Sequence, residues 1–222
     1  MAEQPEEPNY EALEMQDIIK VPKDRLGVII GKSGKNKEII EELTETSLDI
    51  DSENNTVVIK PKGTIKDPTL IWKARDIIKA IARGFNEKKA MKLVDSNFML
   101  RIITLDFDKK SKKINRVRGR LIGENGKARK IMEDISGVDI SVFGNTVSLI
   151  GEIEDLNVTE EAIKMIINGA RHSTAYRHLE KFKQEKKVKP PQMWQKREDV
   201  VFEEIKKEFS NPQPDQSDDL EK

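Results

Sequence analysis

Hydrophobic and polar residues alternate along this chain with two different periods, and the same succession of periods occurs twice. Stretches in which every second residue is apolar predict strands, and apolar residues three or four places apart predict amphipathic helices. In the first half we expect a strand at 16–21, helices at 26–30 and 35–43, strands at 47–51 and 56–60, and a helix from 70 to about 84. In the second half we expect a strand at 98–107, helices at 115–122 and 127–135, strands at 138–143 and 146–150, and a helix at 156–168. The order β-α-α-β-β-α therefore occurs twice and predicts an α+β fold built from two copies of one module.

Each module is expected to end in an additional helix. A glycine typical of a helix C-terminus, Gly84 or Gly169, is followed at similar distances by two apolar residues. These are Ala90 and Leu93 in the first module and Ala175 and Leu179 in the second.

The chain is expected to divide into four segments. An acidic N-terminus at 1–14 is predicted to be disordered, and two domains follow at 15–95 and 96–187. The C-terminal tail at 188–222 contains a partial helical pattern at 194–209.

The two modules are most alike in a segment that contains two glycines. Residues 29–43 read IIGKSGKNKEIIEEL and residues 121–135 read LIGENGKARKIMEDI, with the first glycines, Gly31 and Gly123, 92 positions apart. In both copies the glycines separate a short apolar helix from the start of an amphipathic one. Glycine allows backbone angles and close approaches that a Cβ atom would block, and the first amides of a helix attract phosphate. Because lysines and arginines lie beside them, these loops are predicted to hold the phosphates of a nucleic acid.

The loop has two other possible interpretations, a structural turn and a Walker loop. A purely structural turn with solvated lysines is the weaker alternative, because both the charges and the apolar pattern are repeated. A Walker loop is suggested by Gly31-Lys32-Ser33, but that motif requires glycine at position 26, where this chain has Leu26. The second copy has no Gly-Lys-Ser/Thr sequence at all, so nucleotide hydrolysis is rejected.

The charges are balanced in total but unevenly distributed. The 222 residues include 40 Lys and Arg and 40 Asp and Glu, which gives a formal net charge of zero. Residues 109–130 nevertheless contain ten basic residues and a single acidic one, Glu124, whereas both ends of the chain are acidic. A local positive potential attracts a polyanion whatever the total charge, so the distribution favours nucleic acid as the ligand.

Composition disfavours several classes of protein. Without cysteine the chain can form no disulfide, thiolate nucleophile or cysteine zinc site. The two histidines, His172 and His178, have no cluster of ligating residues nearby in the sequence, so we expect neither a metal nor a cofactor. No apolar stretch approaches the roughly 20 residues that cross a bilayer, and the acidic N-terminus lacks the features of a signal peptide. We therefore expect a cytoplasmic protein that does not associate with membranes.

The order of elements and the Gly-x-x-Gly loop resemble type I KH domains, in which such a loop holds the backbone of about four nucleotides of single-stranded RNA. The resemblance implies that each module is a three-stranded sheet with helices on one face. It implies clamps at Gly31-Lys32-Ser33-Gly34 and Gly123-Glu124-Asn125-Gly126, each beside an apolar groove for bases. The grooves are expected to be lined by Ile29, Ile30, Ile39, Ile40 and Ile50, and by Leu121, Ile122, Ile131, Met132 and Ile140.

Longer stretches narrow the resemblance to one family. The segments GKSGKNK, AIARGFNEKKAMKL and GARHSTAYRHLE are similar to archaeal members of the partner-of-Nob family of small-subunit ribosome assembly factors. Lys37 and Arg129 stand where most KH helices have an apolar residue, which fits this family better than KH proteins at large. The resemblance covers roughly residues 15–187. It implies binding of rRNA or its precursor near the 3′ end of the small-subunit RNA, with contacts to the maturation endonuclease and to the alpha subunit of translation initiation factor two.

We therefore predict a non-catalytic RNA-binding protein with two clamps. The predicted RNA-binding residues are Gly31, Lys32, Ser33, Gly34, Lys35, Lys37, Arg116, Arg118, Arg120, Gly123, Glu124, Asn125, Gly126, Lys127, Arg129 and Lys130. Among them Glu124 brings a negative charge to the second clamp, which weakens phosphate contact if the carboxylate faces the RNA. The alternative function is a protein-interaction adaptor that links ribosome maturation and translation initiation factors, with RNA binding secondary. A nuclease is disfavoured, because metal-dependent cleavage needs converging carboxylates and the acidic residues lie mainly on helix surfaces and tails.

Overall fold

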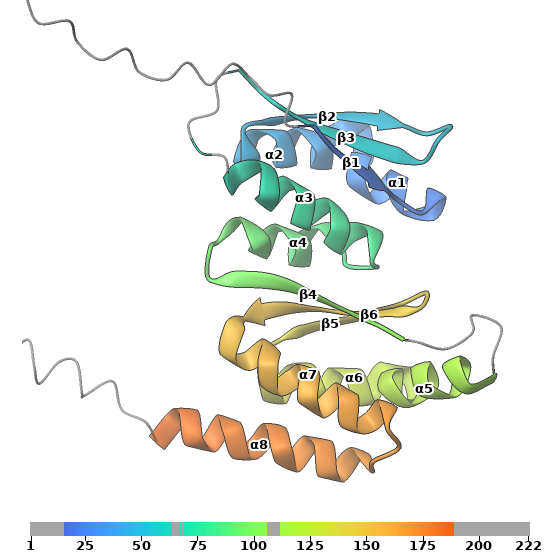
Figure 1. The fold of residues 1–222 in the computed structure, drawn as a ribbon, viewed down its shortest axis with the longest axis vertical. Coiled ribbons are helices and arrows are strands. Elements are labelled where there is room, and N and C mark those ends of the chain that lie inside the picture. The colour runs from blue at the N-terminus through green and yellow to red at the C-terminus, as the bar shows by residue number, and fades with distance from the viewer. Residues whose placement is uncertain (1–15, 64–66, 68, 106–111, 189–222) are drawn as a thin grey trace, which may run out of the picture. The chain divides into compact units, whose positions relative to one another are not determined.

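The computed structural model describes residues 16–63, 67, 69–105 and 112–188 of the chain (Figure 1). One compact unit ends at Lys181 and contains two antiparallel sheets, and another begins at Phe182. The acidic N-terminus, the end of the strand expected at 98–107, the first part of the basic segment and the tail with its partial helix lie outside the described residues.

The first module follows the predicted order of elements. It consists of β1 (Asp17–Lys20), α1 (Lys23–Ile30), the 3-10 turn η1 (Lys32–Gly34), α2 (Lys35–Thr44), β2 (Thr46–Asp51), β3 (Thr56–Pro61) and α3 (Thr69–Ala82). A one-turn helix α4 (Glu87–Ala90) and a 3-10 turn η2 (Met91–Val94) follow. Strand β3 pairs antiparallel with both neighbours, which gives the strand order β1-β3-β2.

The second module repeats this arrangement. It consists of β4 (Phe98–Thr104), α5 (Lys112–Ile122), the 3-10 turn η3 (Glu124–Gly126), α6 (Lys127–Ser136), β5 (Asp139–Phe143), β6 (Thr146–Glu152), α7 (Ile153–Ile167) and α8 (His172–Val188). The strand order is β4-β6-β5. The predicted α+β fold with two β-α-α-β-β-α modules is therefore confirmed. The additional helices differ in length, because α4 has 4 residues and α8 has 17.

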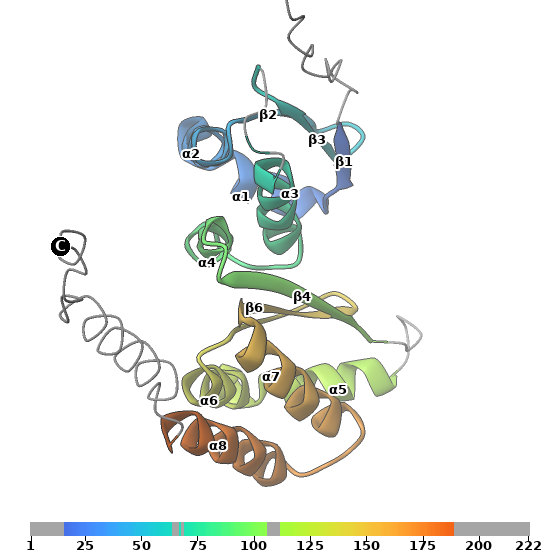
Figure 2. The same cartoon turned by 60° about the vertical axis from the view of Figure 1, so that its left-hand side comes forward.

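Helices cover one face of each sheet and bury an apolar core there (Figures 1 and 2). In the first module Ile29 of α1, Ile40 of α2 and Leu48 of β2 are at most 1% exposed. The residues 92 positions later are as fully buried, and they are Leu121, Met132 and Ile140. Both modules thus use the same positions of the repeat for their cores.

The other face of the second sheet is also buried. Alternate residues of a strand point to opposite faces of the sheet, and in β6 both sets are covered. Val147 and Leu149 belong to the core of the second module, whereas Ile150 belongs to the core of the first. Phe98 and Leu100 of β4 pack against the same first-module core. Within the unit that ends at Lys181, the second sheet therefore lies between its own helices and the first module.

Ionic contacts accompany this apolar packing. Lys89 Nζ lies 2.9 Å from both Glu133 Oε1 and Asp139 Oδ1, and Lys92 Nζ lies 2.6 Å from Asp139 Oδ2. Burial raises the pKa of Asp139, but hydrogen bonds from Lys92 and Lys89 outweigh it and hold this pKa below its ordinary value. Burial likewise lowers the pKa of Lys89, but its hydrogen bonds to Asp139 and Glu133 prevail and the pKa is raised. Both shifts favour the charged forms of the network.

An arginine closes the C-terminal end of the long helix in the first module. Arg25 of α1 donates from Nε to the carbonyl oxygen of Ile81 at 2.9 Å and from Nη2 to that of Phe85. The last carbonyls of a helix have no partner within the helix. The Ile81 carbonyl also accepts from the amide of Gly84 at 3.0 Å, so the guanidinium is its second donor, whereas for Phe85 the guanidinium supplies the hydrogen bond.

In the second module an arginine also caps the C-terminal end of the long helix, but from a different position of its own helix. Arg120 of α5 donates from Nη1 to the carbonyl oxygen of Ile166 at 2.7 Å and from Nη2 to that of Ala170. These carbonyls follow the matching ones of the first module by 85 positions. Arg120, however, lies about one helical turn beyond the place that matches Arg25. The acceptor carbonyls thus occupy matching positions in the two modules, whereas the arginines that donate to them do not.

We predict that Arg120→Met lowers the free energy of unfolding by about 2 kcal/mol, because the Ala170 carbonyl loses its donor and the Ile166 carbonyl, which also accepts from the amide of Gly169 at 3.1 Å, loses one of its donors. Urea denaturation measures this change. Arg116→Met is the matched control on the same helix, since Arg116 is exposed, and we expect a change within about 0.5 kcal/mol. Equal losses in the two variants would contradict the capping role of Arg120.

The lowered pKa of Asp139 predicts a dependence of stability on pH. A carboxyl with a lower pKa in the folded than in the unfolded state stabilises the fold above about pH 4, and this contribution is lost as the pH falls through the folded pKa. We expect Asp139→Asn to lower the thermal midpoint at neutral pH but to flatten its decline between about pH 5 and pH 2.5. Thermal unfolding followed by circular dichroism tests this, and a decline as steep as that of the wild type would count against the prediction.

Candidate nucleic-acid interface

The two Gly-x-x-Gly loops have the same backbone conformation. Gly31 has φ 73° and ψ −179°, and Gly123 has φ 73° and ψ 178°. The second glycines, Gly34 and Gly126, are left-handed with φ 83° and 77°. The loops therefore repeat in structure as well as in sequence.

The two glycines of a loop are required for different reasons. A Cβ atom on Gly31 would lie 2.5 Å from Asn36 Cγ, and one on Gly123 would lie 2.6 Å from Ala128 Cβ. The second glycines have nothing within 4 Å of a Cβ position, so only their positive φ favours glycine. The first glycine allows the loop to pack against the following helix, and the second allows the chain to turn into that helix.

The central residues of both loops are strained and exposed. Ser33 has φ 56° and Asn125 has φ 50°, which costs a residue other than glycine about 1–3 kcal/mol. Each is exposed, as is the residue before it, Lys32 or Glu124. The amides of Gly31 and Gly34 donate to the main chain, whereas within the described part of the chain the amides of Lys32 and Ser33 have no main-chain acceptor. The same strain at the same place in two copies points to a functional use of the loop.

Cations surround the first loop. Lys32 and Lys35 are exposed, and neither makes an ion pair with another described residue. Lys37 lies on the next turn and its Nζ is 3.8 Å from Glu41 Oε1. Two lysines are thus free to neutralise phosphate at the N-terminal end of α2, where the helix dipole adds to their attraction.

The predicted basic residues of the second loop fall into two groups. Arg116, Lys127 and Lys130 are exposed and Arg118 is half-buried, with its Nε lacking a partner among the described residues. Arg120 is committed to the main chain at the end of α7, as described above.

Arg129 is the other predicted arginine that makes a main-chain contact. Its Nη1 lies 3.3 Å from the carbonyl oxygen of Ile140 on the edge strand β5. On the same strand the amide of Ile140 donates to Glu133 Oε1 at 2.9 Å, just as the amide of Leu48 donates to Glu41 Oε1 at 2.7 Å in the first module. A glutamate of the second helix therefore accepts from the edge strand in both modules. In the second module Arg129, which stands where most KH helices have an apolar residue, contacts that strand as well.

The expected lining of the base grooves is wrong for half of its residues. Side chains that the sequence placed in the grooves are at most 1% exposed and form the core instead, namely Ile29, Ile40, Leu121, Met132 and Ile140. For the four helical residues, the period of the helix places a side chain on the inner or outer side only to within one position, and here they point inward. Ile140 lies on β5, where its side chain belongs to the core. The remaining five, Ile30, Ile39, Ile50, Ile122 and Ile131, are half-buried.

A groove with a volume of about 320 Å³ lies beside the second loop. It is lined by residues of α5, the loop, α6 and α8, namely Gly119, Arg120, Gly123, Glu124, Lys127, Ala128, Ile131, His172 and Tyr176. The sequence gives no sign of a role in binding for His172 or Tyr176, because only the tertiary structure brings α8 beside the loop.

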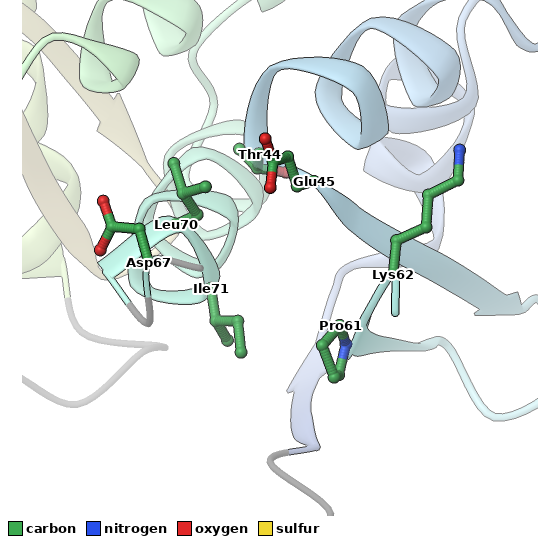
Figure 3. Close-up of a pocket in the computed structure, with 7 residues that line it drawn as sticks. All are labelled: Thr44, Glu45, Pro61, Lys62, Asp67, Leu70 and Ile71. Carbon is green, nitrogen blue, oxygen red and sulfur yellow. The ribbon is translucent and has the colours of Figure 1, made fainter. Parts of the chain in front are cut away.

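A second hollow lies in the first module at the end of α2 and the start of α3 (Figure 3). Its volume of about 10 Å³ is no more than a single water molecule needs. Asp67, which forms part of its wall, accepts hydrogen bonds from the amide and the hydroxyl of Thr69 at 2.9 and 2.6 Å and so caps α3. We therefore assign this hollow to the packing around the helix cap and not to ligand binding.

Both histidines have partners inside the protein. His172 Nε2 lies 2.8 Å from the carbonyl oxygen of Arg120, and His178 Nε2 lies 3.0 Å from Glu161 Oε2. Among the described residues no group of three or more His, Asp or Glu side chains is arranged to hold a metal ion. No helix in the described ranges combines the length and the apolar character needed to span a bilayer.

Two family models match this chain. A model described as a eukaryotic type KH-domain (KH-domain type I) matches residues 99–184, and a KH domain model matches residues 16–79. The two matches fall on the second and first modules respectively.

Similar proteins come from archaea. The KH domain-containing protein MJ0443 of Methanocaldococcus jannaschii is 42% identical over 185 residues, which are 83% of this chain and 81% of that protein. The crystal structure of Dim2p from Pyrococcus horikoshii has a TM-score of 0.71 and 41% identity, and the match covers 76% of this chain and 99% of that one. A chain of the a/eIF2alpha-aDim2p-rRNA complex from the same organism has a TM-score of 0.73 and 40% identity, with 79% and 97% covered.

A third solved structure, a protein of unknown function (APE0754) from Aeropyrum pernix, has a TM-score of 0.74 and 33% identity, with 86% of this chain and 98% of that one covered. Because sequence identity, both modules and the fold agree over most of each chain, the protein belongs to the partner-of-Nob family of KH-domain ribosome assembly factors, to which the archaeal Dim2 proteins belong.

Proposed function

We propose that this protein binds single-stranded RNA with two phosphate clamps, one in each of the modules at 15–95 and 96–187. The observation that carries the proposal is the presence of two loops with the same strained backbone, each with two exposed central residues at the start of a helix. KH domains hold RNA with such a loop. No step of this function needs a catalytic group or a cofactor.

In each clamp a phosphate would accept hydrogen bonds from the free amides of the two central loop residues. Lys32 and Lys35 add charge at the first loop, and Lys127 and Lys130 add charge at the second. Two weak sites joined in one chain bind an RNA that spans them more tightly than either alone, because the second contact is intramolecular. The contacts between the modules described above favour this effect, since they limit the distances that the RNA must bridge.

The relatives favour rRNA as the ligand. One similar chain comes from a complex that contains a/eIF2alpha, aDim2p and rRNA. We therefore propose that this protein acts in the cytoplasm in assembly of the small ribosomal subunit, on RNA near the 3′ end of its rRNA. We propose the alpha subunit of translation initiation factor two and the endonuclease that matures this RNA as its protein partners.

A protein-interaction adaptor remains the second candidate function. The observation in its favour is that the relative's complex contains a protein partner beside the RNA. Association with the alpha subunit of the initiation factor after nuclease treatment would favour the adaptor. Loss of that association on removal of the RNA would favour RNA as the primary ligand.

We predict that changing Lys32 and Ser33 together to aspartate weakens RNA binding at least tenfold, because two carboxylates replace a cation where phosphate binds. The fold should persist, because both residues are exposed and aspartate tolerates the left-handed conformation of Ser33. Glu124→Asp with Asn125→Asp tests the second clamp and should have a smaller effect, since that loop already contains a carboxylate. Fluorescence anisotropy with a labelled oligonucleotide measures affinity, and unchanged affinity in both double variants would rule out the clamps.

The phosphate contacts also predict a steep dependence on salt. For single strands the slope of log K against log salt is about −0.7 per phosphate contact. Lys35→Ala and Lys127→Ala should each reduce the slope by about 0.7, as one contact is lost. Lys164→Ala is the matched control, because Lys164 lies on neither loop and its Nζ is paired with Glu160 Oε1 at 2.8 Å on α7. A slope that is the same in all three variants and in the wild type would show that these lysines do not bind phosphate.

A further inference from the structure

The groove beside the second loop is lined in part by the predicted clamp and in part by α8. Gly123, Glu124 and Lys127 belong to the clamp, whereas His172 and Tyr176 belong to α8. A phosphate held by the loop would therefore lie at the mouth of the groove. The volume of about 320 Å³ is at the lower end of the roughly 300–1,000 Å³ that small-ligand pockets occupy.

The side of the groove formed by α5 is open because Gly119 has no side chain. A Cβ atom at this position would meet nothing within 4 Å, and the φ angle of Gly119 is not positive. Neither packing nor backbone conformation therefore requires glycine here, although glycine in a helix costs about 1 kcal/mol relative to alanine. Its lack of a side chain leaves this side of the groove open.

The opposite side of the groove is fixed in place by contacts of α8. Ala175 and Leu179 are buried in the core of the second module. His172 Nε2 donates its proton to the carbonyl oxygen of Arg120 at 2.8 Å, since a carbonyl can only accept. The ring of Tyr176 lies 6.0 Å from that of His172 and is half-buried at the groove. An aromatic surface is therefore positioned beside the clamp before any ligand binds.

Burial raises the pKa of Tyr176 above its ordinary value, so the phenol is neutral at physiological pH and does not repel an anionic ligand. Lys127 is exposed at the same groove and provides a positive charge. An aromatic ring beside a cation is the combination with which proteins hold single-stranded nucleic acid, because the ring stacks on a base while the cation contacts the backbone.

We propose that this groove takes one nucleobase of the bound RNA, from the nucleotide whose phosphate is held by the second loop. The base stacks on Tyr176, and Lys127 contacts its phosphate. The carboxylate of Glu124 accepts a hydrogen bond from an exocyclic amino group of the base. This inference rests on the proposed function and adds to it a base-binding subsite that shares only Ile131 with the grooves expected from the sequence and has α8 as one of its walls.

This arrangement assigns a role to the negatively charged Glu124, which would otherwise only weaken phosphate binding at the loop. A carboxylate accepts hydrogen bonds only, and cytosine, adenine and guanine carry exocyclic amino groups whereas uracil carries none. The first loop has Lys32 at the matching place, so this selection belongs to the second module. Uridine at the position held by the second loop should therefore bind more weakly than the other three nucleotides.

The experiment uses the full chain and single-stranded RNA of twelve nucleotides with 2-aminopurine placed at each position in turn. Stacking on an aromatic ring quenches this fluorescent base, so quenching at one position identifies the nucleotide in the groove. We expect Tyr176→Leu to weaken binding about tenfold and to abolish this quenching. Tyr176→Phe restores the ring and should restore the quenching. The salt slope of Tyr176→Leu should equal that of the wild type, because no phosphate contact is lost.

A second variant tests the groove without changing Tyr176, and a third serves as its control. Gly119→Leu places a side chain in the groove from a position where a Cβ atom meets nothing within 4 Å, and it should reproduce the loss of affinity and quenching. Because glycine is the weaker helix former, we expect no loss of thermal stability. Ser173→Leu is the matched control, because Ser173 is exposed on α8 and does not line the groove.

Failure of this inference can be told apart from failure of the proposed function. If the loop double variants lose RNA binding but Tyr176→Leu and Gly119→Leu retain wild-type affinity and quenching, the groove holds no base and the inference is overturned. If the loop variants also bind as the wild type does, the clamps themselves are absent and the proposed function fails with it.

Discussion

The structure depends on a steric constraint at the loop between two helices. Ile29 at the end of the first helix and Ile40 in the second must both enter one core, and only the few residues of η1 separate the helices. The chain can turn this sharply only with left-handed backbone at Gly31, Ser33 and Gly34 and with no Cβ atom against Asn36. The turn that lets the core form also leaves the two central residues, Lys32 and Ser33, exposed at the N-terminus of α2. The backbone that folding requires is thus the one to which we assign phosphate binding.

The two copies of the module use the outer faces of their sheets differently. On β1 the side chain of Ile18 is 63% exposed, whereas Ile150 on β6 is fully buried against the first module. The ionic network of Lys89 and Lys92 with Glu133 and Asp139 lies beside this packing. These ion pairs are only partly shielded from solvent, because the side chains of Lys89 and Lys92 are 33% and 45% exposed, and such pairs add little to stability. Apolar burial therefore provides most of the stability of the contact.

The two loops differ in charge and in the elements that lie beside them. The first has the cation Lys32 at its centre. The second has Glu124, and the structure brings α8 with Tyr176 to the same place. In the first module the corresponding helix α4 is a single turn that supplies Lys89 to the network with the second module instead. One repeat has thus produced two sites with different chemistry.

The sequence alone determined the order of elements, the positions of both loops and the need for their glycines. These features are local, since they follow from the period of apolar residues and from the backbone freedom of single residues. The sequence did not determine the direction of each apolar side chain, so residues such as Met132 and Ile140 were expected in a groove and lie in the core. Nor could it show that Arg120 caps a distant helix while Arg116 stays exposed, because both are arginines of one basic segment. The groove at Tyr176 also required the tertiary structure, since more than 40 residues separate α8 from the loop and only the packing of Ala175 and Leu179 into the core brings them together.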